Sequence, residues 1–213
     1  MANPPSQRSV KIGADERGGW SSDRPRPGGG PARPADISTR CRVLSPSDRM
    51  RYSPGSVVIV IAPAAGEGNR FAERLIEERG ALLSLDKVRG LLAGRVDAEQ
   101  VEERATELLL AAARKRMEAG ETVIIVTETL DPAEREPFLR AATSARRPRH
   151  AILLDAGAAQ MGDEDRGALN ELRRALDAGE LGAEGFQTAL RLNQSAASEL
   201  KKILFRPPPR DDD

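Results

Sequence analysis

The chain has 213 residues, enough for one domain of about 150 residues plus a tail, but hardly enough for two domains. Its 33 basic and 33 acidic side chains cancel, so no net field attracts nucleic acid or an anionic membrane. A single cysteine, Cys41, excludes an internal disulfide framework and a cysteine cluster for zinc. No segment resembles an apolar signal core or a membrane span, so we expect a soluble, cytoplasmic protein without membrane contact.

Residues 1–55 have the composition of a disordered arm. They hold 8 of the 15 prolines, 7 of the 19 glycines, and 10 Lys and Arg against 5 Asp and Glu. A segment this rich in Pro and Gly cannot bury enough apolar surface to offset the entropy of ordering. We therefore expect a basic arm at 1–55, a mildly acidic domain at 56–207 and a polar tail at 208–213.

From Ser56 onward, short β-branched runs alternate with amphipathic segments, which predicts an α/β fold with a mostly parallel sheet and helices on both faces. The five predicted strands are 56–62, 81–85, 122–126, 150–155 and 186–192. Predicted helices cover 70–79, 97–119, 163–179 and 194–204, and another opens at Asp131. Asp97 and Asp131 are the clearest expected N-caps, because Gln or Glu follows each of them three residues later.

The segment APAAGEGNRF (62–71) follows the first predicted strand and would meet a helix N-terminus, where free N–H groups can hold phosphate. A phosphate loop of the G-x-x-x-x-G-K-[ST] type uses glycines for close backbone approach, lysine for the terminal phosphates and a hydroxyl for magnesium. Laid on without gaps, these four motif positions fall on Ala62, Glu67, Gly68 and Asn69. A shift by one residue recovers only a glycine, at Gly68.

These replacements predict a degenerate phosphate (Walker A) loop. The Glu67 carboxylate would repel phosphate or take its place, and the missing lysine removes the main cation. Triphosphate binding should therefore be badly weakened. Gly66 and Gly68 still allow a tight loop, and Arg70 could reach a phosphate in place of lysine.

The order and spacing of several segments resemble bacterial P-loop kinases of the AAA-family ATPase type, most closely the kinase domain of bacterial polynucleotide kinase-phosphatases. Besides the first loop, the resemblance rests on ALLSLDKVRGLL, RMEAGETVIIV, DPAEREPFLRAA, RHAILLDA and LRRALDAGELGAEGF, and it covers about residues 56–207. It implies a P-loop NTPase-type three-layer sandwich around a five-stranded sheet.

The resemblance also carries over one pair of candidate catalytic residues. In that family Asp-x-x-Arg follows the second strand, the aspartate taking the proton of the acceptor hydroxyl and the arginine holding the substrate. Asp86 and Arg89 match this pattern in SLDKVRG. Asp86 fits the N-cap of the next helix equally well, and Arg89 a surface position, so both interpretations stay open.

Other family features have changed. Where the family reads close to VDATN after the third strand, this chain reads VTETL, and the arginine-rich lid is replaced by GAAQMGDEDRGALNELRR. Of the arginines that remain there, Arg173 and Arg174 are expected to be solvated on a helix. His150 has no Ser, Cys or second His at a suggestive spacing, so we give it no catalytic role.

Three hypotheses about function follow. The first is a pseudokinase, a kinase scaffold that binds an unidentified protein partner with weak or no ATP binding, no cofactor and no metal. The second is an atypical kinase that uses ATP and Mg to phosphorylate a nucleic-acid 5′-hydroxyl or a small alcohol, with Asp86 as base. The third is a nucleic-acid-binding module that uses the basic arm and the residual cleft.

Overall fold

The computed structural model describes residues 40–63, 65–155 and 162–206. All of these residues belong to one compact unit, Ser38–Asp213. Most of the predicted arm and the tail at 208–213 lie outside the described residues. Among the residues that are described, no helix has the length and apolar character needed to cross a membrane.

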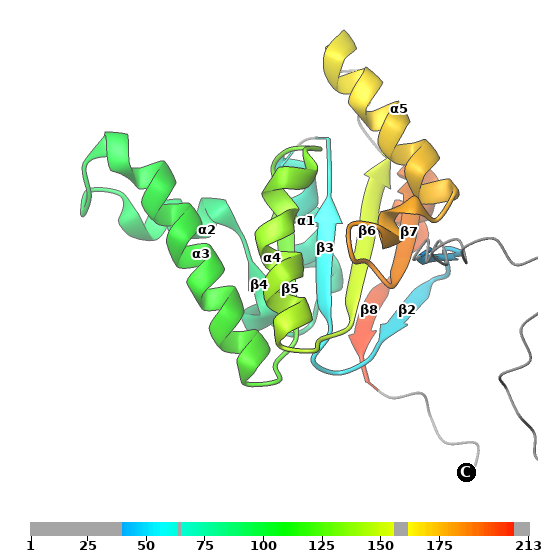
Figure 1. Ribbon diagram of the computed structural model, residues 1–213, viewed down its shortest axis with the longest axis horizontal. Helices are drawn as coiled ribbons and strands as arrows, with labels where there is room; N and C mark the ends of the chain where they lie inside the picture. The colour runs from blue at the N-terminus through cyan, green and yellow to red at the C-terminus, as the bar shows by residue number, and fades with distance from the viewer. Residues whose placement is uncertain (1–39, 64, 156–161, 207–213) are drawn as a thin grey trace, which may run out of the picture. The chain divides into compact units, whose positions relative to one another are not determined.

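The centre of the fold is a six-stranded parallel sheet with the order β1-β7-β6-β3-β5-β4 (Figure 1). Its strands are β1 (Arg42–Leu44), β3 (Val57–Ile61), β4 (Leu82–Leu83), β5 (Val123–Thr127), β6 (Arg149–Asp155) and β7 (Thr188–Asn193). A second, two-stranded parallel sheet pairs β2 (Arg49–Tyr52) with β8 (Lys202–Phe205). The chain crosses over β3 between β5 and β6, so the carboxyl end of β3 is the switch point where such sheets bind ligands.

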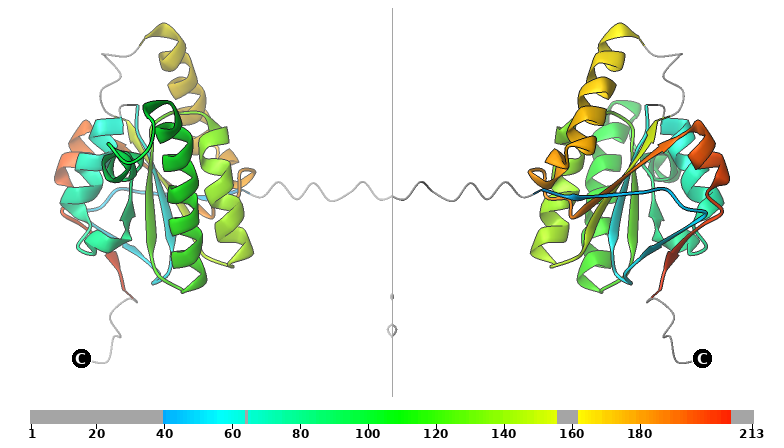
Figure 2. Two further views of the ribbon diagram at one scale, coloured as in Figure 1. Left: turned by 90° about the vertical axis from the view of Figure 1, so that its left-hand side faces the viewer. Right: turned by 90° about the vertical axis from the view of Figure 1, so that its right-hand side faces the viewer.

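Helices cover both faces of the sheet, which Figure 2 shows edge-on between them. They are α1 (Ala65–Leu75), α2 (Leu85–Leu92), α3 (Val101–Glu118), α4 (Pro132–Ser144), α5 (Asp163–Asp177) and α6 (Gln194–Glu199), with 3₁₀ turns η1 (Arg79–Ala81), η2 (Ala98–Gln100) and η4 (Glu180–Gly182). The helices α3, α4 and α5 pack their apolar stripes on one face, whereas α1, α6 and the β2–β8 pair cover the other. The predicted three-layer α/β architecture is confirmed.

The sequence predicted the strands of this unit better than it predicted where the helices and the unit itself begin and end. All five predicted strands are present, and Asp131 caps α4 as expected, since its Oδ1 accepts a hydrogen bond from the Ala133 N–H at 2.9 Å. Asp97, in contrast, caps only η2 and makes no side-chain bond there. The predicted helix 194–204 ends at Glu199, where the chain turns into β8.

The folded unit begins before Ser56, so the expectation of an arm up to residue 55 is wrong for its last part. β1 adds a sixth strand beside β7, and β2 pairs with β8. Cys41, Met50 and Tyr52 are buried, so Cys41 is a core residue with a pKa that burial raises. Composition concealed these strands because they are only three and four residues long and their partners lie far away in the sequence.

His150 is a buried packing residue, in agreement with the absence of a catalytic constellation. Its Nδ1 lies 2.8 Å from Thr188 Oγ1 and its Nε2 lies 3.2 Å from Ser56 Oγ. Its ring centroid is 4.6 Å from that of Tyr52, which β2 places over this face of the sheet. Burial, with the charge of Arg149 nearby, lowers the pKa of His150 to about 4.

We therefore expect His150→Gln to flatten the pH dependence of stability. In the unfolded chain the imidazole takes up a proton near pH 6.5, whereas in the folded protein it stays neutral down to about pH 4. The contribution of His150 to stability is complete above pH 6.5, and about 3 kcal/mol of it should be lost as the pH falls to 4. Urea unfolding of both proteins at pH 7, 5.5 and 4 measures the difference, and equal losses would contradict the assignment.

Candidate functional site

The segment predicted to be a phosphate loop folds as the beginning of a helix. β3 ends at Ile61 and α1 begins at Ala65, so residues 62–64 alone connect them. The candidate cofactor-binding residues Gly66, Glu67, Gly68, Asn69 and Arg70 all lie in α1. Backbone N–H groups within a helix bond to the preceding turn, and only those of its first turn stay available to a ligand. The tight loop that Gly66 and Gly68 would have allowed is therefore not the conformation of the described residues 65–70.

Gly68 is required for close packing rather than for a loop. A Cβ atom at this position would lie 2.5 Å from Val126 Cγ1 on β5 and 3.2 Å from Ala62 Cβ. The motif lysine, which falls on this residue in the ungapped alignment, therefore has no room for its side chain. At Gly66, two residues earlier in the same helix, an added Cβ meets no atom within 4 Å.

The two glycines make a matched pair of variants. Gly68→Ala should lower the free energy of unfolding by about 1–3 kcal/mol, because α1 must move away from β5. Gly66→Ala should leave it unchanged or raise it by up to about 1 kcal/mol, because alanine favours the helix and nothing obstructs its methyl group. Urea denaturation of both variants tests this, and equal effects of the two substitutions would refute the packing role of Gly68.

The other three candidate residues of α1 do not form a phosphate site together. Glu67 lies in the first turn, where the helix dipole favours its charge, and its Oε2 is buried without a hydrogen bond among the described residues. Asn69 donates from Nδ2 to Asp86 Oδ2 at 2.9 Å. Arg70 is exposed and makes no hydrogen bond or ion pair within the described part of the chain. Of the three, only Asn69 contacts the predicted Asp-x-x-Arg motif, through its hydrogen bond to Asp86.

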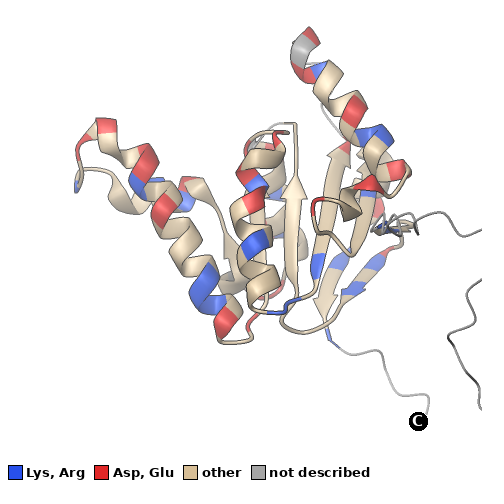
Figure 3. Ribbon diagram, in the orientation of Figure 1, with Lys and Arg blue, Asp and Glu red and all other residues tan. Residues whose placement is uncertain are grey.

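Asp86 and Arg89 do come together, and two further carboxylates join them. The helices α2 and α3 lie against each other, and both carry basic (blue) and acidic (red) residues in Figure 3. We call the set Asn69, Asp86, Arg89, Glu102 and Glu128 the Arg89 cluster. Arg89 Nη1 donates to Asp86 Oδ1 at 3.1 Å and to Glu128 Oε1 at 2.5 Å.

The remaining donors of Arg89 are also engaged. Nη2 donates to Glu128 Oε2 at 2.8 Å and to Glu102 Oε1 at 2.6 Å, while Nε donates to Glu102 Oε2 at 2.8 Å. A guanidinium has five N–H donors, and Arg89 makes five hydrogen bonds to carboxylates. Glu128 and Glu102 raise the pKa of Arg89, and Arg89 lowers the pKa of Glu102. Arg89 therefore has no donor left for a phosphate.

Asp86 is not the N-cap of α2. Ser84 holds that position, and its Oγ accepts a hydrogen bond from the Lys87 N–H at 3.3 Å. Asp86 lies in the first helical turn with its carboxylate largely exposed, receiving one hydrogen bond from Asn69 and one from Arg89. With three carboxylates and one guanidinium the cluster carries a formal charge of −2, which opposes the binding of an anion.

The partners of Arg89 should differ in energy. Its pair with Glu128 is bidentate and only partly exposed, so a double-mutant cycle with Arg89→Met and Glu128→Gln should give a coupling of about 1–2 kcal/mol. Glu102 is 63% exposed, so the cycle with Glu102→Gln should give less than about 1 kcal/mol. Urea denaturation supplies both values. A larger coupling to Glu102 would show that solvent exposure does not set the order.

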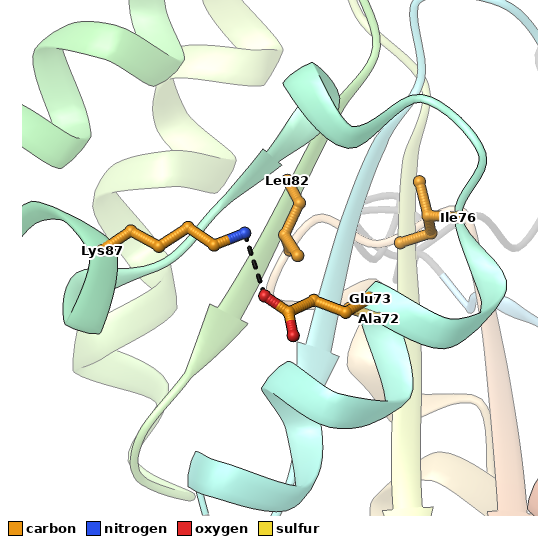
Figure 4. A pocket seen from close by; sticks show the side chains of 5 residues that line it. All are labelled: Ala72, Glu73, Ile76, Leu82 and Lys87. Atoms are coloured by element: carbon orange, nitrogen blue, oxygen red, sulfur yellow. Dashed lines mark ion pairs between the residues drawn. The ribbon is translucent and has the colours of Figure 1, made fainter.

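The other basic residue of α2 is paired as well. A hollow of about 260 Å³ lies beside α1 and β4. Its apolar lining is formed by Ala72, Ile76 and Leu82 (Figure 4). Lys87 Nζ reaches across it to Glu73 Oε1 at 3.1 Å. Both cations of α2 are thus neutralised by carboxylates of neighbouring elements.

The N–H groups that follow β5 are occupied by a side chain of the next helix. Glu134 accepts hydrogen bonds from the N–H groups of Glu128 at 2.7 Å and Thr129 at 2.8 Å, and from Thr129 Oγ1 at 2.7 Å. The predicted capping-box residue thus reaches into the loop before the cap. Thr127, which falls on the family's aspartate position, is buried and donates to the Val60 carbonyl.

The arginines expected to remain from the lid have mixed positions. Arg173 is not simply solvated, because its Nε donates to Asp155 Oδ1 at 2.8 Å, and Arg191 Nε donates to Asp155 Oδ2 at 2.8 Å. Burial of Asp155 opposes its charge, but the two arginines outweigh that effect and lower its pKa. Arg174 is exposed and unpaired in the described part of the chain, and residues 156–161 lie outside it.

Comparison with known proteins agrees with this fold. Residues 69–167 match the AAA domain family, and the match begins after Gly68. No curated protein sequence matches the chain.

The sequence predicted Asp86 and Arg89 of the Arg89 cluster but not Glu102, because nothing in the local pattern of α3 marks this exposed glutamate as a partner of α2.

Several solved structures are similar to the chain at low identity. A protein of Chloroflexus aurantiacus J-10-fl, described as a putative kinase, shares 18% identity with a TM-score of 0.44, covering 67% of this chain and 87% of that one. The tunicamycin resistance protein of Deinococcus radiodurans shares 18%, with a TM-score of 0.37 and coverage of 72% and 99%. A sugar kinase of Janibacter sp. HTCC2649 shares 14%, with a TM-score of 0.38 and coverage of 69% and 91%.

Proposed function

The chain is a P-loop kinase-like protein, and we propose that it is a pseudokinase, a kinase scaffold that binds a protein partner with little or no phosphoryl transfer. The observation that carries the proposal is the start of α1 at Ala65, with Gly68 packed against Val126. Phosphoryl transfer needs a backbone cradle and a cation at the phosphates. In this protein α1 begins only four residues after β3 ends, and Gly68 within α1 leaves no space for a lysine side chain.

The charges around the carboxyl end of the sheet support the same conclusion. Lys87 and Arg89 are paired with carboxylates, and the Arg89 cluster has a negative formal charge. Glu134 holds the N–H groups of the loop after β5. A nucleoside triphosphate would have to displace the carboxylates that bind Lys87, Arg89 and these N–H groups. We therefore propose that ATP and Mg are not cofactors of this protein.

One observation favours an active kinase as a second candidate. The Asp86 carboxylate is exposed at the carboxyl end of β4 and receives only two hydrogen bonds, so it could still accept a proton from an alcohol or a nucleic-acid 5′-hydroxyl. Arg70 would then be the cation at the phosphates, because it is exposed and unpaired among the described residues. The nucleic-acid-binding alternative has no comparable support.

Calorimetry with ATP and Mg²⁺ separates the two candidates. We expect no binding tighter than about 100 μM, roughly −5.5 kcal/mol, because Gly68 leaves no room for the motif lysine and the donors of Arg89 are all engaged. Tighter binding that Arg70→Ala abolishes would overturn the pseudokinase proposal. Arg174→Ala is the matched control, because it removes another exposed arginine that has no partner in the described structure.

A further inference from the structure

A groove lies between α4 and α5, on the sheet face opposite α1. Its volume is about 430 Å³, within the roughly 300–1,000 Å³ typical of ligand pockets. The helices α3 and α4 pack on each other, whereas α5 packs on η4 and β7, which leaves the space between α4 and α5 unfilled. Leu130, Leu172, Ala175 and Leu181 form its apolar lining. We call it the α4–α5 groove.

One face of α5 makes a long wall of this groove. It is lined by Asp165, Ala168, Glu171, Leu172 and Ala175, whose spacings of three, three, one and three residues place them along one side of the helix. At a rise of 1.5 Å per residue the wall is about 15 Å long. That length suits about three turns of a partner helix or a short extended segment.

At the base of the groove, the charge of Arg135 is already paired with that of Glu184. Arg135 is 1% exposed, and its Nε and Nη2 donate to Glu184 at 2.5 and 2.8 Å. Its Nη1 donates to the Leu130 carbonyl at 2.9 Å. Because each nitrogen of this buried guanidinium already donates within its own chain, Arg135 is not available to attract an anionic ligand.

The rim of the groove is acidic and lacks basic partners. Asp131, Asp165 and Glu171 are exposed, and none of them forms an ion pair with a described residue. Asp131 uses one oxygen to cap α4. In Figure 3, α5 and the start of α4 carry red bands of acidic residues as well as blue bands of basic ones. An apolar floor inside an uncompensated acidic rim is complementary to an apolar side chain that has cations on both sides.

We propose that the α4–α5 groove binds a segment of a partner protein in which one or two large apolar residues are flanked by Arg or Lys. The apolar residues would fill the floor beside Leu172 and Leu181, and the flanking cations would pair with Asp131, Asp165 and Glu171. The inference rests on the proposed scaffold function, to which it adds the chemistry of the partner and the surface that binds it.

A labelled peptide tests the groove on the full chain. The probe is a fluorescein-labelled twelve-residue peptide with two leucines among four arginines, titrated by fluorescence anisotropy at 50 mM and 300 mM salt. We expect saturable binding that weakens at the higher salt, because the rim charges are exposed and screened. A peptide with glutamates in place of the arginines, and one with serines in place of the leucines, should each bind at least about tenfold more weakly.

Charge reversal then locates the site. Asp165→Lys with Glu171→Lys should weaken binding of the arginine peptide about tenfold or more at 50 mM salt. A control variant, Glu103→Lys with Glu107→Lys, makes the same change in net charge on α3 and should leave binding within about twofold. Thermal unfolding of both variants confirms that the substituted proteins are folded.

Several outcomes would overturn the proposal. They are the absence of binding up to 1 mM peptide, equal binding of the glutamate peptide, equal loss in both double variants, and binding of N-acetylarginine amide as tight as that of the peptide. The last result would mean a small-molecule site. Failure here without ATP binding leaves the scaffold proposal standing, whereas ATP binding together with peptide binding would refute the pseudokinase and keep the groove.

Discussion

The close approach of α1 to the sheet at Gly68 is the constraint on which the site depends. A Cβ here would meet Val126 and Ala62, so the helix can lie this near to β5 only because residue 68 has no side chain. The helix α1 begins at Ala65, soon after β3 ends at Ile61. That placement brings Asn69 to Asp86, and Asp86 in turn contacts Arg89. A packing contact thus sets the chemistry of the neighbouring cluster.

Pairing of buried or half-buried arginines with carboxylates of the same chain recurs across the described structure. Arg89 is surrounded by Asp86, Glu102 and Glu128, Arg135 is paired with Glu184, and Asp155 receives two arginines. The basic groups of these three sets are therefore held internally, whereas Arg70 is exposed and unpaired among the described residues. Acidic side chains without a basic partner among the described residues lie on exposed surfaces, and the rim of the α4–α5 groove is one of these surfaces. A surface of this kind favours cationic partners over phosphates.

The sequence predicted what depends on buried periodicity and on local caps. β3 and β5 are entirely buried runs, and Asp131 lies directly before a proline at the first helical position, so both were recognisable. Features that depend on distant partners were not. β1 and β2 are stabilised by β7 and β8, and Glu102 reaches Arg89 only because α3 packs on α2. The motif alignment placed a phosphate loop over 62–71, whereas the described residues from Ala65 onward belong to α1.

The parallel pairing of β2 with β8 has a consequence for how the protein is made. Arg49 pairs with Lys202, so β2 leaves the ribosome about 150 residues before the strand that it needs. At roughly 5–20 residues per second, the delay is on the order of ten seconds. During that time Met50 and Tyr52 cannot take their buried positions on β8. The hydrophobic side chains of β2 are thus available to chaperones until the last strand of the unit has been synthesised.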